Sequence, residues 1–479
     1  MTASMEQRYQ ERLWRYTTAM GNGKPDKVPI RPFVAEFAAK YAGYNCQQVT
    51  HDFEPAMAAV RKCAADFDWD AVVGNMVYVW TALTEAIGLK YYAAPGMSIP
   101  PEIGFQYLEP PEHESNMRAD EYDALIADPT EFLFNTWLPR VSRDVVPIGQ
   151  PSTFRNNLSF LKGGMAMLHY FMAFGGQNQR LRAECGMPAA IGGILKAPLD
   201  ILGDKFRGYY GLTNDLLEQP EKVLAACRAL MPHLMHVALT SADPERKAPI
   251  TIWMHRGCVP FITPQQFETV FWPTLRPIIE TLWGHGYQVL FYAEGNWDAH
   301  LEVFAELPER SIIYHVDRGD IFKAHNVLGK RFCLSGGIPN TLLARGTEGE
   351  VRDYCKKVID GVAADGGYIM DASAIVQNDA TIENVRAMTD FTREYGVYPG
   401  VSPKLDAPIE PIGTPDDKRV AQWASEFACD CPAPGVCVPW ETKRREIPQI
   451  LGDEQIVRRM WENIESFAYT YIYQCLVSF

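Results

Sequence analysis

The sequence of residues 286–320 reads GYQVLFYAEGNWDAHLEVFAELPERSIIYHVDRGD. It begins with an apolar run, Tyr287–Tyr292, and closes with a second one, Ile312–Val316. Between the two runs, apolar residues recur at helical spacing from Leu301 to Leu307. Continuous apolar runs, unlike alternating ones, are typical of strands buried on both faces of a parallel sheet. The stretch therefore predicts a strand, a helix and a second strand parallel to the first.

Each of these two strands ends near a side chain that binds metal ions or carries protons. Glu294 follows the first strand, and His315 lies at the end of the second, twenty residues further on. In a parallel α/β barrel the carboxyl ends of the strands converge on one mouth, where active sites lie. We therefore expect both side chains to face one cavity there. Because catalytic zinc takes carboxylate and imidazole ligands, the pair is a candidate zinc site. A helix-capping Glu and a hydrogen-bonded structural His are the alternative.

Strands and helices continue to alternate on both sides of this stretch. Such alternation over roughly 370 residues argues for a parallel sheet. We predict an α/β fold, a (β/α)8 TIM-type barrel with N-terminal helices and a C-terminal extension. A doubly wound open sheet is the alternative, but the sequence has no G-x-G-x-x-G or Walker-type loop. The remaining strands are predicted at residues 28–35, 71–76, 189–195, 250–254, 331–334 and 368–370.

Two regions depart from the alternation. Residues 87–160 are rich in Pro and Gly, and we interpret them as an excursion that forms one wall of a site. Residues 397–417 read VYPGVSPKLDAPIEPIGTPDD, which is typical of an extended strap. We therefore predict one barrel over residues 1–395 and an extension, residues 396–479, that packs on it.

Composition narrows the function classes. The net charge is −14, with 59 acidic against 45 basic residues, which disfavours binding to nucleic acid or to anionic membranes. The N-terminus lacks the apolar core of a signal peptide, and the most apolar run, 163–176, is too short to span a bilayer. Eleven cysteines without an export signal indicate a reducing compartment, so we expect a cytoplasmic protein. Cys429, Cys431 and Cys437 lack the paired spacing of structural zinc sites, and their role stays open.

Other predicted strands also end in side chains suited to chemistry. His255 and Asp371 are predicted catalytic groups, with a structural role as the alternative for each. Cys333 is a candidate soft metal ligand, with an inert buried cysteine as the alternative. Aromatic contacts to a substrate ring are predicted at Tyr78, Trp80, Tyr209 and Tyr210.

The order and spacing of several segments resemble the uroporphyrinogen decarboxylase superfamily, and within it the corrinoid-dependent methyltransferases. The likeness covers most of residues 25–395. It rests on GILKAPLDILGDKFRGYYGL (193–212), on FITPQQFETVFWPTLRPIIETLWGHGYQVLFYAEGNWD (261–298) and on HVDRGDIFKAHNVLGKRFCLSGGIPN (315–340), among others. The resemblance implies a (β/α)8 barrel with its site at the C-terminal ends of the strands.

Two departures from the family refine this expectation. The decarboxylases carry an arginine-rich segment after the first strand, whereas residues 33–44, FVAEFAAKYAGY, contain no arginine, which argues against porphyrinogen decarboxylation. The thiol-activating methyltransferases carry His-x-Cys where this chain has Tyr-Ala-Glu at 292–294, and a later Cys near the position of Ser373. The resemblance thus implies a zinc site of oxygen and nitrogen donors, Glu294 and His315, as in the first methyltransferase of anaerobic O-demethylase systems.

The resemblance predicts a zinc-dependent methyltransferase that moves a methyl group from a small methoxylated, aromatic compound to the Co(I) of a corrinoid. The sequence has no D-x-H-x-x-G signature, so the corrinoid is expected on a separate partner protein; a homodimer is also compatible. The third zinc ligand is open among His255, Cys333 and Asp371. One alternative is a methyltransferase of the same fold with another methyl donor, or with a thiol or folate acceptor. The other is a non-catalytic barrel that binds a tetrapyrrole or a corrinoid protein.

Overall fold

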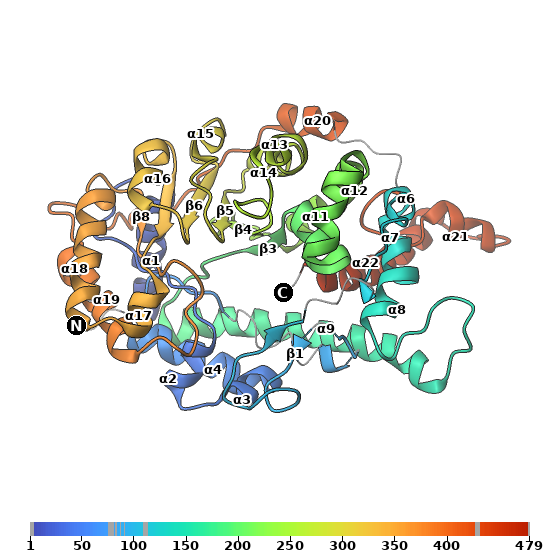
Figure 1. Ribbon diagram of the computed structural model, residues 1–479, viewed down its shortest axis with the longest axis horizontal. Helices are drawn as coiled ribbons and strands as arrows, with labels where there is room; N and C mark the ends of the chain where they lie inside the picture. Colours follow the sequence, from blue (N-terminus) through green and yellow to red (C-terminus); the bar gives the residue numbers. More distant parts are fainter. Residues whose placement is uncertain are drawn as a thin grey trace.

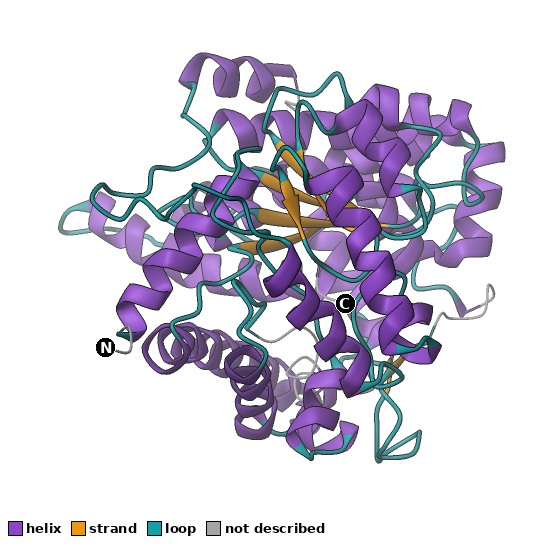
Figure 2. Cartoon of the chain, turned by 90° about the vertical axis from the view of Figure 1, so that its left-hand side faces the viewer, coloured by secondary structure: helices purple, strands orange, loops and turns teal. Residues whose placement is uncertain are grey.

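A computed structural model describes residues 4–74, 81, 84–86, 88–90, 92–108, 114–426 and 432–477. At its centre is a parallel sheet that helices enclose (Figures 1 and 2). Each strand pairs in parallel with the next strand along the chain. The strands are β3 (Gly193–Lys196), β4 (Ile250–Met254), β5 (Val289–Ala293), β6 (Ile312–Val316), β7 (Cys333–Gly336) and β8 (Tyr368–Ile369).

Backbone pairing closes this sheet into a barrel. Ile30 forms a parallel bridge with Met370, just after β8, and its carbonyl accepts the N–H of Asp70 at 2.8 Å. Val72 in turn forms a parallel bridge with Ala189, just before β3. The segments around Ile30 and Val72 therefore take the places of the first two strands. This confirms the predicted (β/α)8 TIM-type barrel.

Helices form the outer wall of the barrel. Before β3 they are α1 (Met5–Met20), α2 (Glu36–Ala42), α3 (Cys46–His51), α4 (Phe53–Asp66), α6 (Tyr122–Ala127), α7 (Pro129–Phe132), α8 (Leu138–Val141) and α9 (Phe154–Arg180). Between the strands they are α10 (Pro198–Ile201), α11 (Gly208–Glu218), α12 (Pro220–Ser241), α13 (Pro264–Gln266), α14 (Trp272–Gly284), α15 (Leu301–Phe304), α16 (Ile321–Leu328), α17 (Asn340–Arg345) and α18 (Glu348–Val358). After β8 they are α19 (Ile382–Tyr395), α20 (Asp417–Glu426), α21 (Trp440–Glu446) and α22 (Glu454–Val477).

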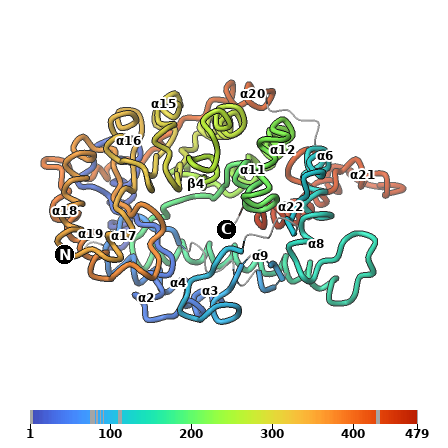
Figure 3. The backbone as a smooth tube through the Cα atoms, viewed as in Figure 1, coloured from blue at the N-terminus to red at the C-terminus, as the bar shows by residue number. Residues whose placement is uncertain are grey.

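Shorter elements complete the wall. The excursion contains a small antiparallel sheet of β1 (Tyr92–Ala93) and β2 (Gln106–Tyr107), and it ends in α9, which passes along the barrel (Figure 3). The π-helical segments that extend several helices are η2 (Leu133–Trp137), η3 (Leu181–Cys185), η4 (Leu202–Arg207), η5 (Phe267–Phe271) and η6 (Ile359–Ala363).

Some element boundaries differ from the sequence-based expectation. Pro29 and Pro32 lack N–H donors, and the predicted first strand consists of isolated bridges rather than a regular strand. The helical region after β3 divides at Pro220, which begins α12. The hydroxyl of Thr263 caps α13 by accepting from the N–H of Gln266.

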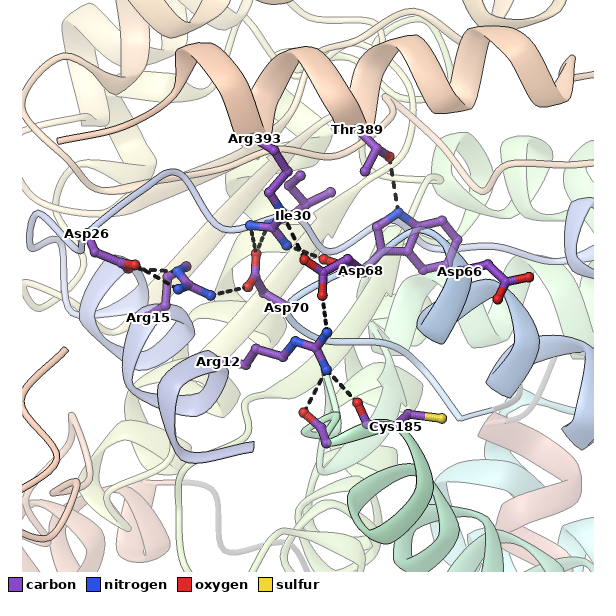
Figure 4. Close-up of polar contacts among 12 residues, drawn as sticks. Arg12, Arg15, Asp26, Ile30, Asp66, Asp68, Asp70, Cys185, Thr389 and Arg393 are labelled. Carbon is purple, nitrogen blue, oxygen red and sulfur yellow. Dashed lines mark hydrogen bonds and ion pairs between the residues drawn. The ribbon is translucent and has the colours of Figure 1, made fainter. Parts of the chain in front are cut away.

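A buried ion-pair network ties α1 to the first two strand positions and to α19 (Figure 4). The carboxylate of Asp70 pairs with Arg15 Nη1 at 2.5 Å and with Arg393 Nη1 at 2.7 Å, and it accepts the N–H of Ile30 at 2.8 Å. Arg15 also pairs with Asp26 at 2.7 Å. Burial would raise the pKa of Asp70, but the two guanidinium groups outweigh it and hold that pKa well below its usual value.

The C-terminal segment lies against the outer helices. Here α20 contacts α14, while α22 contacts α12 and α9. The hydroxyl of Tyr473 on α22 is 3.1 Å from that of Thr130 on α7. Cys437 is a free cysteine, and Cys429 and Cys431 lie outside the described residues.

One described helix has the length and composition of a membrane span. Within the described residues, α12 alone has the required length and hydropathy, and 56% of that window is buried in the protein. It packs against β3 and α14, as a helix of the barrel wall does.

Candidate active site at the barrel mouth

The register of the sheet sorts the inward-facing side chains into layers. Lys196, Trp253, Tyr292, His315 and Ser335 are consecutive register partners from β3 to β7. Register partners share one face of the sheet, because side chains alternate along a strand. We call this set the inner layer. Side chains two positions further along each strand lie about 6–7 Å closer to the mouth.

The next set, which we call the mouth layer, consists of His255, Glu294, Asp317 and Asp371. The backbone pairing continues into this layer, since the N–H of Glu294 donates to the carbonyl of Met254 at 3.0 Å. The N–H of Gly295 donates to Asp317 Oδ2 at 2.8 Å. On β6, Asp317 rather than His315 therefore shares a layer with Glu294.

His315 is a packed and fully bonded member of the inner layer. Its ring stacks on Tyr292 with centroids 4.2 Å apart and lies edge-on to Phe33 at 6.2 Å. Nε2 donates to the carbonyl of Ser373 at 2.9 Å, and Nδ1 accepts from the hydroxyl of Ser335 at 3.0 Å. Burial lowers the pKa of His315 well below its usual value, so the ring is neutral.

The zinc ligands predicted from the sequence lie in three successive layers. Glu294 is in the mouth layer, His315 in the inner layer, and Cys333 one layer deeper, since it precedes Ser335 by two residues. The thiol of Cys333 is fully buried, and burial raises its pKa. Among the described residues, no group of three His, Cys, Asp or Glu side chains is placed to hold a metal ion. The predicted ligand set therefore does not converge in this structure.

Asp371 forms a buried ion pair instead of facing an open cavity. Its Oδ2 lies 2.9 Å from Arg31 Nη2, and its Oδ1 accepts the N–H of Phe33 at 3.2 Å. The guanidinium of Arg31 also donates to Ser335 Oγ at 3.0 Å, which links this pair to His315. Burial raises the pKa of Asp371 to about 7, against the opposing effect of Arg31. Asp371 therefore titrates near neutrality inside the barrel.

Three carboxylates, Asp200, Asp204 and Glu294, converge on His255. Its Nε2 lies 3.0 Å from Asp204 Oδ1, and the other oxygen of Asp204 binds Lys196 Nζ at 2.7 Å. Its Nδ1 lies 3.3 Å from Asp200 Oδ1 and 3.6 Å from Glu294 Oε2. His255 and Glu294 are partly exposed, with side-chain exposures of 24% and 33%, whereas Asp200 and Asp204 are buried. Of these groups, His255 and Glu294 are therefore the ones that solvent reaches.

This arrangement favours the protonated forms of both exposed groups. Burial alone would lower the pKa of His255, but the carboxylates of Asp204 and Asp200 outweigh it and raise that pKa. Burial raises the pKa of Glu294, although His255 opposes the shift. Burial would raise the pKa of Asp204, but His255 and Lys196 hold it well below its usual value. The pair His255–Glu294 can therefore hold a proton at the mouth.

The chain after β3 supplies the carboxylates that sequence reasoning missed. Asp200 on α10 accepts the backbone N–H groups of His255 and Arg256 at 2.7 and 2.8 Å, which fixes the loop after β4. Asp204 follows four residues later in the π-helical segment η4, a kind of element often found at functional sites. Two carboxylates four residues apart, directly after a predicted strand that ends in Lys196, were the sequence feature that could have indicated this cluster.

The structure describes two of the four aromatic residues that were predicted to contact a substrate, Tyr209 and Tyr210. Tyr209 stands beside the mouth: its ring packs edge-on against Phe261 at 5.1 Å, and the guanidinium of Arg256 lies 5.5 Å from its centroid. Tyr210 is more exposed, at 62%. Outside the described residues lie Tyr78 and Trp80.

Comparison with known proteins agrees with this architecture. The family model of uroporphyrinogen decarboxylase (URO-D) matches residues 175–395. A solved methyltransferase from Methanosarcina mazei superposes with a TM-score of 0.53 and 14% identity, covering 82% of this chain and 99% of that one. No curated protein matches the sequence. The structural likeness shows a shared fold. The family match covers β3 to β8 and with them the mouth layer. Residues 175–395 of this chain are therefore similar to the uroporphyrinogen decarboxylase family.

Proposed function

We propose that this protein is a methyltransferase that removes a methyl group from a small methoxylated, aromatic substrate and passes it to the Co(I) corrinoid of a separate protein. The observation that carries the proposal is the pair His255–Glu294, 3.6 Å apart at the barrel mouth with the pKa of both groups raised. The shared fold with a protein named as a methyltransferase supports it.

Cleavage of an aryl methyl ether needs what this pair supplies. When the methyl carbon leaves, its oxygen keeps the bonding electron pair and becomes a phenolate. A positioned acid that protonates this oxygen as the bond breaks contributes about 10²–10⁴-fold to such a reaction. His255 and Glu294 hold a proton within hydrogen-bonding reach of a substrate at the mouth. We assign Glu294 as the proton donor and His255 as the group that reprotonates it.

The buried residues keep this donor in position. Asp204 and Asp200 fix both the ring and the backbone of His255, and Lys196 neutralises Asp204. The ring of Tyr209, beside Arg256, is a candidate wall for an aromatic substrate. The corrinoid of the partner supplies the nucleophile, so this chain has to orient the ether and exclude water.

Zinc, which the family resemblance implies, fits this arrangement poorly. Glu294, His315 and Cys333 occupy different layers, and both ring nitrogens of His315 are engaged. Acid catalysis at Glu294 therefore takes the place of a Lewis acid in this proposal. Removal of metal by a chelator is expected to leave the activity of the purified protein unchanged.

Methyl transfer to cob(I)alamin, followed by its absorbance, tests the proposal. The wild-type protein is expected to methylate the cobalt with a guaiacol- or veratrole-type donor and to release the corresponding phenol. Glu294→Gln is expected to lower kcat by about 10²-fold, because it keeps the size of the side chain but holds no ionisable proton. Glu302→Gln, an exposed substitution on α15, is the matched control and should keep full activity.

Three outcomes would overturn the proposal. Turnover of methylamines or thioethers without turnover of any ether would assign another methyl donor. Wild-type activity in Glu294→Gln would remove the proton donor. Tight binding of a corrinoid protein without any turnover would point to a binding role.

A further inference from the structure

Residues 92–108, which we call the hairpin, lie at the rim of the barrel mouth. They contain the paired strands β1 and β2. The ring centroids of Tyr92 and Tyr107 each lie 5.9 Å from Nζ of Lys205. Lys205 follows Asp204 in η4, which belongs to the connection from β3 to β4. This end of the hairpin therefore lies at the rim that follows β3.

The other end of the hairpin lies at the rim that follows the last strand. The carbonyl of Glu102 accepts from Asn378 Nδ2, in the loop after β8, at 2.9 Å, and from Cys46 Sγ of α3 at 3.1 Å. The carbonyl of Pro101 accepts the N–H of Gln47, also on α3, at 3.0 Å. The hairpin thus bridges two rims on the side of the barrel where the strands have their carboxyl ends.

Gly104 brings the backbone of the hairpin directly onto Glu36. A Cβ at this glycine would lie only 2.5 Å from Oε1 of Glu36, closer than real atoms approach. The hairpin gains little from apolar packing, since Met97, Ile103 and Leu108 remain between 45% and 58% exposed. Segments with few buried apolar contacts open at a low cost in free energy. The polar contacts and the close approach at Gly104 therefore decide whether the hairpin stays in place.

Glu36 begins α2, directly after the first strand position, and its carboxyl is buried against the hairpin. The residue is 4% exposed, and among the described residues its Oε2 has no hydrogen-bond partner. Lys40, one turn further along α2, donates instead to the carbonyls of Asn378 and Ala380. An ionised carboxylate without a partner is costly to bury. The docked hairpin therefore favours the protonated form of Glu36.

The other titratable groups around Glu36 do not offset this cost. Burial raises the pKa of Glu36, and Asp379 in the loop after β8 adds to the rise, whereas the N–H of Glu36 itself opposes it. From α3, the thiol of Cys46 lies within electrostatic range, and burial raises its pKa to about 11, so it is neutral. Glu102 on the hairpin is exposed and acidic. In the part of the chain that the structure describes, the groups that face Glu36 from these three elements are thus neutral or negative.

We propose that the hairpin is a lid on the barrel mouth, closed when the Glu36 carboxyl is protonated and released when it ionises. Opening gives the carboxylate the water that the closed position withholds. Gly104 has no side chain, so the closed lid can lie directly on the carboxyl. The closed form binds a proton that the open form releases, so rising pH favours the open lid. Such a lid governs access to the mouth, whichever reaction takes place there.

Hydrogen–deuterium exchange of peptides from the hairpin, corrected for the intrinsic exchange rate, tests the lid. As pH rises above the ordinary glutamate pKa of about 4.3, wild-type protection should fall by up to about tenfold per pH unit until Glu36 is ionised. Glu36→Gln keeps the size of the side chain but cannot ionise, so its protection should stay at the acidic value throughout. Glu383→Gln, an exposed acid in the first turn of α19, is the matched control and should keep the wild-type pH dependence.

Gly104→Ala tests the contact itself. The added Cβ would overlap the carboxyl of Glu36, so protection of the hairpin at acidic pH should fall at least about tenfold. Gly349→Ala on α18, where the nearest atom is 4.0 Å from the added Cβ, should leave protection unchanged. Peptides that contain β5 report the folded barrel in the same samples and should be equally protected in every variant. Wild-type protection that is independent of pH, a pH dependence that persists in Glu36→Gln, or wild-type protection in Gly104→Ala would each overturn the proposal.

Discussion

His255 and Glu294 face each other across the ends of β4 and β5, with 3.6 Å between Nδ1 and Oε2. Asp200 and Asp204 lie behind the imidazole, and Glu294 lies in front of it. The carboxylates behind favour the imidazolium, and partial burial raises the pKa of the Glu294 carboxyl against the opposing effect of His255. The mouth of the barrel therefore carries an acid.

The first prediction concerns the pH dependence of activity. An acid acts in its protonated form, so kcat should fall as pH rises through the pKa values of the His255–Glu294 pair. Asp204→Asn removes a carboxylate 3.0 Å from His255, which lowers the pKa of His255. We expect the alkaline limb of the kcat profile to move about one to three pH units lower. Asp123→Asn, on the surface, should leave the limb in place. An unmoved limb in Asp204→Asn would separate His255 from the acid function.

The second prediction separates a structural His315 from a metal ligand. His315→Ala should destabilise the protein by about 2–4 kcal/mol, because it leaves the carbonyl of Ser373 without its donor and opens a cavity beside Tyr292. Urea denaturation measures this change, and His325→Ala on α16 is the control. The metal content measured on the purified proteins should be equal in both variants. Loss of bound zinc in His315→Ala, with stability unchanged, would contradict the structural role.

The third prediction concerns Asp70. Asp70→Asn should cost about 3–5 kcal/mol at pH 7, because it removes the buried carboxylate that pairs with both Arg15 and Arg393 and leaves Arg15 with Asp26 alone. The pKa of Asp70 is lowered in the folded state, so its stabilisation is complete above the unfolded value of about 3.9 and is lost as pH falls below it. The difference between wild type and variant in urea should therefore narrow below about pH 4.

Asp68→Asn is the control for this network, since the side chain of Asp68 is 63% exposed. Its cost should stay within about 1 kcal/mol. A wild-type-like Asp70→Asn would mean that the network does not stabilise the barrel.

The fourth prediction concerns Asp371, whose pKa is raised to about 7 by burial. The folded state then binds a proton that the unfolded state releases above about pH 4, so this group makes stability fall as pH rises from about 4 to about 7. Asp371→Asn cannot titrate, and it should flatten that part of the curve of unfolding free energy against pH. Urea midpoints at half-unit pH intervals measure the slope. An equal slope in both proteins would show that Arg31 holds Asp371 ionised throughout.

Much of the barrel follows from the sequence because its strands are buried on both faces. Runs such as Ile250–Met254 and Ile312–Val316 are fully buried, and such runs admit few other placements between helices. The first strand is less regular than its apolar run predicts, because Pro29 and Pro32 interrupt its pairing. Residues His255 and Glu294 follow such runs directly, so their place at the mouth was also predictable.

The order of residues sets the alternation of strands and helices, and with it the end of the barrel at which polar groups gather. Which of these groups meet depends on the three-dimensional fold. A step of two residues along a strand moves a side chain one layer, about 6–7 Å, so Glu294 faces His255 and shares its layer with Asp317, while His315 lies beneath. Spacing along the chain carries no information on this register, because hydrogen bonds between neighbouring strands fix it.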